Sequence, residues 1–259
     1  MTSMTRVLEG KVAVITGAAG AIGMATSRLL AERGATVVAV DRPGTDWSKL
    51  TAALPQGSRL VTAEADVTDE ASVKAYVDKA KAECGRIDIF FNNAGVEGPV
   101  QPIESYPLDA FMQVLGVNVA GVFLGLKYVL PVMYAQGAGS IINTSSVAGL
   151  TGAAGMAGYC TSKHAVVGVT RVAAIEAASR GVRVNCVNPG PIESRMMQSI
   201  NTGQSGDPKL AHEQISNAVP AKRYGTPEEV AGLVAFLASD DSTYCNGGVY
   251  TVDGALTAA

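Results

Sequence analysis

The chain has 259 residues, 47% of them hydrophobic, so it is long enough to bury a large core. Its formal net charge is −3 and its lysines and arginines are scattered, so we expect neither a nucleic acid nor a membrane as partner. The first apolar run is about five residues long, too short for a signal peptide or a membrane span, which predicts a cytoplasmic protein.

The first predicted elements are a strand, a glycine-rich turn, a helix and a second strand. Residues 11–16 and 36–41 form short apolar runs rich in β-branched side chains, and residues 24–34 have the apolar spacing of a helix. The turn reads GAAGAIG, and Asp41 ends the second strand. Small residues let a backbone approach a pyrophosphate, a helix N-terminus supplies N–H donors, and a carboxylate accepts hydrogen bonds from a ribose diol. This segment therefore predicts a dinucleotide-binding site.

The same alternation continues to the end of the chain. Further strands are expected at residues 59–65, 87–95, 140–146, 182–190 and 247–254, and further helices at residues 68–85, 107–136 and 159–180. Thr68 or Asp69 is expected to cap the first of these helices. Strands that alternate with long helices imply an α/β fold with one doubly wound parallel sheet, in a single domain covering residues 1–259.

Ligands of such a sheet bind beyond the carboxyl ends of its strands. Small or polar residues stand at six of these ends: Gly17, Asp41, Asp66, Asn93, Ser146 and Pro189. Each of them alone is more often a turn or cap residue. Together they predict a continuous cleft along one edge of the sheet.

Tyr159 and Lys163 are four positions apart, so on a helix their side chains lie on the same face. A phenol with a pKa near ~10 is a poor base at neutral pH, but a fixed positive charge nearby favours its ionised form. Tyr159 could therefore exchange a proton with an alcohol or a ketone. A core tyrosine beside a solvated lysine has the same spacing, so the pattern alone leaves both interpretations open.

From Thr16 to its C-terminus the chain resembles the classical short-chain dehydrogenase/reductase family. The motifs that carry the resemblance are TGAAGAIG at residues 16–23, NNAG at residues 92–95, PGPIES at residues 189–194, Asn118, Lys163, and Ser146 thirteen positions before Tyr159. The resemblance implies a Rossmann-like subunit of about seven strands and NAD(P)-linked oxidation of alcohols or reduction of carbonyls. It also implies a homotetramer or a homodimer.

The resemblance implies a role for each of four catalytic residues. Tyr159 would be the acid/base, Lys163 would lower its pKa and hold the nicotinamide ribose, and Ser146 would hydrogen-bond the substrate oxygen. Asn118 would link Lys163 to solvent through a water. The family's thirteen-residue spacing selects Ser146 and leaves Ser145 as a neighbour that is expected to bond locally.

The cofactor-binding residues follow from the same motifs and strand ends. They are Gly17, Gly20, Ala21, Ile22, Gly23, Asp41, Asp66, Val67, Asn93, Ala94, Gly95, Tyr159, Lys163, Pro189, Gly190, Ile192 and Ser194. NAD is the expected cofactor, because the Asp41 carboxylate would repel the 2′-phosphate of NADP. Arg42 directly follows it and leaves use of both cofactors open.

Two positions depart from the family pattern. Ala21 stands where the family usually has a glycine, and its methyl group could weaken pyrophosphate binding unless Gly20 relaxes the turn. Gly158 stands directly before Tyr159, where alanine is common, and the sequence suggests no function for it.

A mobile lid over the substrate is expected at residues 191–220, where the stretch NTGQSGDPK lacks a strong secondary-structure signal. The residues expected near the substrate are Ser146, Val147, Gly149, Met156, Tyr159, Pro191, Met196 and Met197, with Ile200 on the lid. Flexible thioethers suit an adaptable lid, but methionines at this spacing are equally typical of ordinary helix packing.

Charged residues near this pocket leave the substrate's polar groups undecided. Glu97 could select a second hydroxyl or an amine, and Arg195 with Lys222 or Arg223 could bind an anionic tail. Apart from these, the pocket offers few hydrogen bonds, so we expect a small apolar secondary alcohol or its ketone, with cyclic compounds among the candidates.

Two alternatives to an NAD-dependent alcohol dehydrogenase stay open. One is an NADPH-linked 3-oxoacyl-[acyl-carrier-protein] reductase, which shares the catalytic motifs but normally carries basic residues for the 2′-phosphate. The other is a catalytically silent dinucleotide-binding regulator, against which the intact set of four residues argues. No metal site is expected, because the four cysteines are widely spaced and only two histidines are present.

Overall fold

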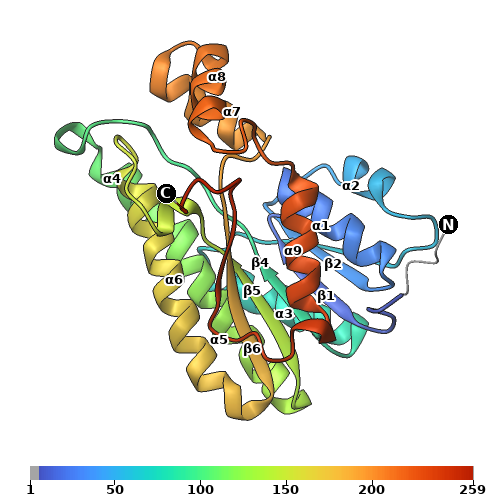
Figure 1. Cartoon of the computed structure of the whole chain (residues 1–259). Helices are drawn as coiled ribbons and strands as arrows, with labels where there is room; N and C mark the ends of the chain where they lie inside the picture. Colours follow the sequence, from blue (N-terminus) through green and yellow to red (C-terminus); the bar gives the residue numbers. More distant parts are fainter. Residues whose placement is uncertain (1–5, 259) are drawn as a thin grey trace.

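Seven parallel strands form one sheet in the computed structural model, which describes residues 6–258 (Figure 1). The order across the sheet is β3-β2-β1-β4-β5-β6-β7. The strands are β1 (Val12–Thr16), β2 (Thr36–Asp41), β3 (Leu60–Glu64), β4 (Ile89–Asn92), β5 (Gly139–Thr144), β6 (Val182–Pro189) and β7 (Val249–Val252). The predicted doubly wound sheet is confirmed. Its strand order reverses between β1 and β4, which is where ligands of such sheets bind.

Helices cover both faces of the sheet (Figure 1). On one face α1 packs against α9, and on the other α3, α5 and α6 lie side by side. The helices are α1 (Ala21–Glu32), α2 (Ser48–Ala53), α3 (Glu70–Cys84), α4 (Leu108–Leu115), α5 (Gly121–Gln136), α6 (Ala157–Ala177), α7 (Arg195–Ser205), α8 (Pro208–Ala218) and α9 (Pro227–Ala238).

The central strand β1 is buried on both of its faces. Val12 and Val14 pack with side chains from α3, α5 and α6, whereas Ala13 and Ile15 pack with α1 and α9. A strand covered on both sides needs apolar residues at every position rather than at alternate ones. This explains why the first strand appears in the sequence as a continuous apolar run.

Four helices, α2, α7, α8 and α9, are additional to those predicted. Two of them begin at residues with a strong capping signal. Asp207 caps α8 by accepting two backbone N–H groups of its first turn, and Thr226 caps α9 in a reciprocal arrangement with Glu229. At the start of α3, where two caps were possible, Asp69 and not Thr68 accepts the hydrogen bonds.

The helical segment predicted at residues 107–136 is interrupted by a π turn. Its two helices, α4 and α5, are joined through Gly116–Ala120, which contains Asn118. Among residues 6–258, Leu108–Gln136 is the one segment long and apolar enough to span a membrane by length and composition. The core helices of soluble proteins pass the same test, and α5 packs on β4 and β5.

Candidate active site

Tyr159 and Lys163 lie one turn apart near the start of α6, as predicted. Both side chains are buried, with 9% and 3% of their surface exposed. The Lys163 Nζ lies 5.5 Å from the centre of the Tyr159 ring and donates a hydrogen bond of 2.8 Å to the carbonyl oxygen of Thr144, at the end of β5. The ammonium is therefore anchored to the sheet and held beside the phenol.

Ser146 and Ser145 point to different partners. The Ser146 hydroxyl accepts the Ala148 N–H at 3.2 Å and donates to the Pro189 carbonyl oxygen at 3.4 Å, and its interaction with the Tyr159 phenol lowers the pKa of that phenol. The Ser145 hydroxyl donates to the carbonyl oxygen of Lys163 at 2.8 Å, which joins the end of β5 to α6. The expectation that Ser145 bonds locally is wrong, because its partner is eighteen residues away.

Asn118 connects three segments around Lys163. Its side-chain oxygen accepts the Val96 N–H at 2.8 Å, and its amide group donates to the Val96 carbonyl and to the Ser162 hydroxyl, each at 2.9 Å. A Cβ at Gly95 would lie 3.2 Å from the Asn118 oxygen and 3.4 Å from the Lys163 Nζ. Both amide hydrogens of Asn118 are engaged, so the side chain positions the loop after β4, and the water link stays a prediction.

Burial dominates the protonation of this site in the protein alone. It raises the pKa of Tyr159 to about 12, and the negative charge of Glu97 acts in the same direction. Burial also lowers the pKa of Lys163 to about 8. The predicted lowering of the Tyr159 pKa is therefore not found here: the spacing of the two residues indicates their proximity but not their loss of contact with water.

The glycine-rich turn forms a cradle at the N-terminus of α1. Gly17 has a positive φ of 65°, and a Cβ at Gly23 would lie 2.1 Å from the Gly17 carbonyl oxygen, so both positions require glycine. Gly20 precedes α1 without a side-chain cap, and Ala21 is the first residue of the helix, next to Ile22. An uncapped helix N-terminus beside a glycine turn suits the diphosphate of a dinucleotide.

The Asp41 carboxylate stands beside this cradle at the end of β2. It accepts the Ala19 N–H of the turn and the Arg42 N–H, each at 2.9 Å. Next to it is a cavity of about 430 Å³, lined by Arg42, Pro43, Gly44, Thr45 and Asp66. The Asp41 carboxylate, held by these two hydrogen bonds, and the neighbouring cavity fit the ribose and base of a dinucleotide whose diphosphate lies on the glycine-rich turn.

The loop after β4 closes the other side of the cradle. Asn93 donates from its side chain to the Thr16 carbonyl at 3.1 Å, and the backbone N–H groups of Asn93 and Ala94 donate to the Thr16 hydroxyl. Thr16 lies in the predicted motif, but the sequence assigned it no role. Val67, predicted to touch the cofactor, lies against the start of α5, where a Cβ at Gly121 would approach it to 2.9 Å.

Three residues after β6 have structural roles that the sequence did not indicate. Gly190 leaves no room for a side chain, because a Cβ would lie 2.8 Å from the Asp253 Cα. The Ile192 side chain is buried with the core between the sheet and α9. Ser194 caps α7 by accepting the Met197 N–H.

A small apolar cluster joins α7 to α6. It contains Ala148, Met156, Tyr159 and Ile200, and Cys160, Met196 and Met197 pack against it. The predicted substrate residues of the lid are therefore brought to Tyr159, and Cys160 is an addition that the sequence did not single out. Val147 lies beside this cluster in the short turn Val147–Gly149, whereas Pro191 lines a separate cavity of about 130 Å³.

The cations proposed for an anionic substrate have other partners. Arg223 makes two hydrogen bonds to Glu229, of 2.9 and 2.6 Å, which hold the pKa of that carboxylate down at about 2. Lys222 donates to the Asn217 carbonyl at 2.6 Å. Arg195 forms an ion pair with Glu97 at 3.7 Å. These contacts do not support the possibility, left open by the sequence, that Lys222 or Arg223 binds an anionic tail.

Tyr106 explains the unusual Gly158. A Cβ at Gly158 would lie 2.9 Å from the Tyr106 hydroxyl oxygen, and one at Gly98 would lie 2.8 Å from it. The Tyr106 ring packs edge-on against Phe111, with the ring centres 6.4 Å apart. The missing methyl group at Gly158 thus makes room for a phenol that lies over the start of α6.

The family model that matches residues 17–257 is described as enoyl-(acyl carrier protein) reductase. Levodione reductase of Leifsonia aquatica is 41% identical over all of this chain and 98% of its own length, and cyclohexanol dehydrogenase of Acinetobacter sp. (strain SE19) is 36% identical over 98% of each. The 3-oxoacyl-[acyl-carrier-protein] reductase of Thermotoga maritima is 40% identical over 96% of this chain and 98% of its own.

Two solved structures have the same architecture. The crystal structure of levodione reductase gives a TM-score of 0.96 and covers 97% of this chain and 99% of its own, at 41% identity. That of NAD+-bound xylitol dehydrogenase gives 0.91 over 95% of this chain and 99% of its own, at 38% identity.

Proposed function

Because the chain belongs to the classical short-chain dehydrogenase/reductase family of oxidoreductases, we propose that it is an NAD-dependent enzyme that interconverts an apolar secondary alcohol, cyclic ones included, and its ketone. The observation that carries the proposal is the burial of Ser146, Tyr159 and Lys163 together, beside the apolar cluster of α7. Two of the relatives are named for levodione and cyclohexanol, which supports a cyclic substrate.

In this proposal each side chain acts at one atom. A bound nicotinamide cofactor supplies the hydride acceptor or donor. The Tyr159 hydroxyl takes the proton of the alcohol or returns it to the ketone, and the Ser146 hydroxyl holds the substrate oxygen. Lys163, anchored on Thr144, keeps a positive charge beside the phenol. The apolar cluster excludes water from the reacting atoms.

The test is turnover by the purified protein with a panel of alcohols and either cofactor, followed by reduced-nicotinamide absorbance. We expect oxidation of cyclohexanol to have a higher kcat/KM than oxidation of xylitol or of a 3-hydroxyacyl thioester. Polyol hydroxyls left unpaired in an apolar pocket cost about 1–3 kcal/mol each. A kcat/KM for the polyol or the thioester more than tenfold higher than that for cyclohexanol would refute the proposed substrate class. If no alcohol reacts, the result favours a catalytically silent regulator.

The 3-oxoacyl reductase is the second candidate, because the Thermotoga maritima relative is as similar as most of the others. Two observations count against it. A carrier-linked chain needs basic residues at the entrance, and Arg223 and Lys222 are engaged elsewhere. The 2′-phosphate of NADPH would also meet the fixed Asp41 carboxylate.

We propose NAD as the preferred cofactor on the position of Asp41, and the NAD+-bound state of the xylitol dehydrogenase structure supports this choice. We expect kcat/KM to be at least ~10-fold higher with NAD than with NADP, because like charges at close range repel. Asp41→Asn should lower the ratio of kcat/KM with NAD to kcat/KM with NADP. Arg42→Ala, which removes the cation lining the cavity, should raise that ratio. A higher kcat/KM with NADP would contradict the assignment.

We further propose a cytoplasmic homotetramer with a mobile lid at residues 191–220. The four free cysteines suit a reducing compartment, and two separate apolar surfaces, one on α5 and α6 and one on α9, suit two kinds of subunit contact.

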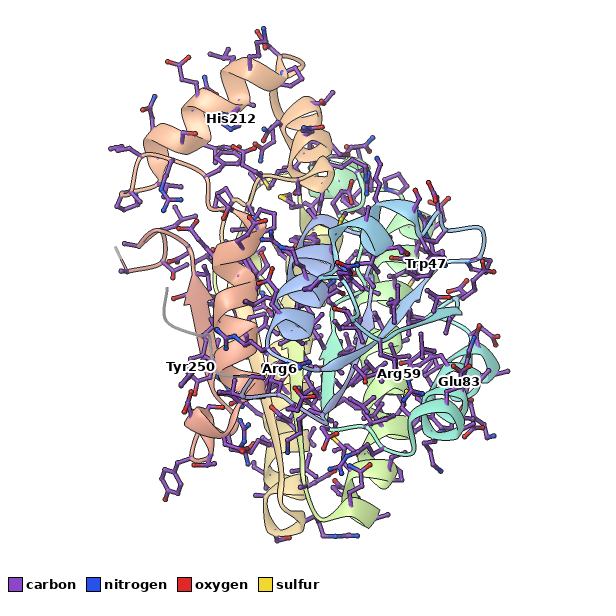
Figure 2. The ribbon with its side chains drawn as sticks, turned by 90° about the vertical axis from the view of Figure 1, so that its right-hand side faces the viewer. Arg6, Trp47, Arg59, Glu83, His212 and Tyr250 are labelled. Carbon is purple, nitrogen blue, oxygen red and sulfur yellow. The ribbon has the colours of Figure 1, made fainter. Side chains whose placement is uncertain are left out.

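The lid consists of α7 and α8. In both figures these helices stand above the rest of the molecule, and His212 marks α8 in Figure 2. Amide hydrogen exchange should be faster in α7 and α8 than in α6, and slower again when cofactor and ketone are bound.

A further inference from the structure

Glu97 is a carboxylate that is almost buried beside the predicted catalytic residues. Only 11% of its side-chain surface is exposed, and its negative charge raises the pKa of Tyr159. A carboxylate is rarely buried this far without a close partner. Its ion pair with Arg195 is long, at 3.7 Å, and the Arg195 side chain is 80% exposed. The carboxylate is therefore only loosely compensated.

The backbone on both sides of Glu97 is fixed. Val96 exchanges two hydrogen bonds with the Asn118 side chain, and Gly98 lies against Tyr106, where a Cβ would approach the hydroxyl to 2.8 Å. Further along, the Val100 side chain lies close to Gly203 of α7. Glu97 thus stands on a loop whose backbone is anchored between α6 and α7, so its Cα is fixed beside the predicted catalytic residues.

The rest of the pocket offers little to a polar substrate group. The cluster around Tyr159 consists of methionine, alanine, isoleucine and cysteine side chains. A largely buried carboxylate whose ion pair with Arg195 is long is stabilised by a hydrogen-bond donor that reaches it. A neutral hydroxyl on the substrate can supply such a donor, whereas a substrate carboxylate would be repelled.

We propose that Glu97 is a specificity-determining residue that accepts a hydrogen bond from a second hydroxyl group of the substrate. The preferred substrates are then cyclic hydroxyketones and the corresponding diols, rather than simple ketones and alcohols. This inference rests on the proposed function, and it narrows the substrate class of the same site. Arg195 pairs with Glu97 from α7, at 3.7 Å.

The test compares NADH-dependent reduction of cyclohexanone with that of 4-hydroxycyclohexanone, which has one reacting carbonyl and one added hydroxyl. The wild-type enzyme should prefer the hydroxyketone by at least ~10-fold in kcat/KM, mainly through a lower KM, equivalent to about 1.4 kcal/mol. Glu97→Gln keeps the shape but not the charge, and should reduce the preference to about threefold or less. Glu104→Gln, at an exposed carboxylate of the same loop, should keep the full preference.

A second readout separates a direct role from a structural one. Removing the charge of Glu97 should shift the pH profile of cyclohexanol oxidation to lower pH, because that charge raises the pKa of Tyr159. Glu104→Gln should leave the profile in place. Glu97→Asp retains the charge, so it should also leave the pH profile near its wild-type position. This variant tests whether a disturbed loop, rather than the lost charge, explains the loss of hydroxyketone preference in Glu97→Gln.

Each outcome has one meaning. If neither ketone is reduced, the proposed function fails and Glu97 has no substrate to select. If both are reduced with equal kcat/KM, or if Glu97→Gln keeps the hydroxyketone preference, the role of Glu97 is refuted while the proposed function stands. Preference for 4-oxocyclohexanecarboxylate over 4-hydroxycyclohexanone would also refute it, because it would assign the selection to Arg195.

Discussion

Burial opposes the charged forms of both Tyr159 and Lys163, since almost no surface of either side chain reaches water. The pKa of Tyr159 is about 12, so the protein alone keeps the phenol neutral. The pKa of Lys163 is about 8, so its ammonium loses its proton at a lower pH than an ordinary lysine does. Whatever lowers the phenol pKa during the reaction must overcome this burial. The Ser146 hydrogen bond acts in that direction, and Glu97 acts against it.

Replacing Tyr159 with phenylalanine should abolish most of the turnover while leaving cofactor binding within about threefold. Phenylalanine keeps the buried ring and removes the exchangeable proton, and positioned acid/base catalysis contributes typically ~10² to 10⁴-fold. The measurement is kcat together with the dissociation constant of NAD. Tyr244→Phe, at a fully exposed tyrosine, is the matched control. A Tyr159→Phe enzyme with more than a tenth of wild-type kcat would rule out the assigned role.

Lys163→Met should change how stability depends on pH. The folded pKa of about 8 lies below the ordinary value of 10.5, so the unfolded chain binds more protons between these values. The free energy of unfolding of the wild type should therefore rise with pH across this window, relative to the variant, by up to about 3 kcal/mol. Urea unfolding at pH 7 and pH 10.5 measures the difference. Lys49→Met, at an exposed lysine, should show no such rise; an equal effect in both variants would contradict the prediction.

Spacing was sufficient to predict that Tyr159 and Lys163 lie on one face of a helix and that Ser146 follows a strand, because both are local properties of the chain. It could not assign the partners of Ser145, Arg223 or Lys222, which depend on segments far apart in the sequence or on the path of a loop. Nor could it give the sign of the pKa shifts, which depend on packing.

The turn before α1 illustrates how one element can carry both folding and binding. A side chain at Gly23 would strike the backbone of Gly17 and Ala18, whereas one at Gly20 would meet only the Gly17 carbonyl oxygen, at 3.3 Å. Gly20 also has an ordinary φ of −73°. The position where the family has a glycine and this chain has Ala21 is the first residue of the helix, where a side chain is compatible with the helix.

Gly23→Ala should therefore destabilise the protein and raise the KM for NAD by at least ~10-fold, because backbone atoms cannot move aside as a side chain can. Gly20→Ala and Ala21→Gly should each change that KM by less than about threefold. The measurements are thermal unfolding without cofactor and steady-state kinetics with varied NAD. A wild-type-like Gly23→Ala enzyme would contradict this account, and a large gain of affinity in Ala21→Gly would show that the methyl group does hinder the cofactor.

All seven strands were predictable, since apolar runs of strand length recur between helical segments. Residues 195–218 were not recognisable as two helices, because their exposed, polar composition hides the apolar stripe. Their stability comes from caps and from tertiary contacts. His212 bonds to Glu193 at 2.9 Å and stacks on Tyr224 with the ring centres 4.1 Å apart.

Among the described residues, helices on both faces of the sheet expose apolar side chains. Phe123 of α5 and Val172 and Ile175 of α6 are 52%, 54% and 80% exposed. Phe236 of α9, which packs on the other face of the sheet, is 38% exposed, and Tyr244, which follows α9 in the chain, is 101% exposed. Grouped apolar residues on a surface are typical of subunit contacts, and two separate surfaces allow a tetramer built from two kinds of dimer contact.

Ile175→Glu should split the proposed tetramer into dimers, because it places a charge in an apolar contact. Sedimentation velocity at micromolar concentration measures the mass directly, and circular dichroism should show an unchanged fold. Glu176→Gln is the control, since it alters a neighbouring exposed residue without adding a charge. A wild-type protein that sediments as a monomer would contradict the assembly, and an unchanged tetramer in Ile175→Glu would exclude this surface from it.

The contact between Tyr106 and Gly158 also constrains how this sequence can diverge. A methyl group at position 158 would lie 2.9 Å from the Tyr106 hydroxyl oxygen, so the Tyr106 side chain would have to shift to make room for it. A homologue with alanine at position 158 is therefore expected to lack the hydroxyl at position 106, or to carry a smaller residue there. These two positions, distant in the chain, should covary, and an ancestor could exchange one pair for the other only through an intermediate that either clashes or leaves a gap beside the start of α6.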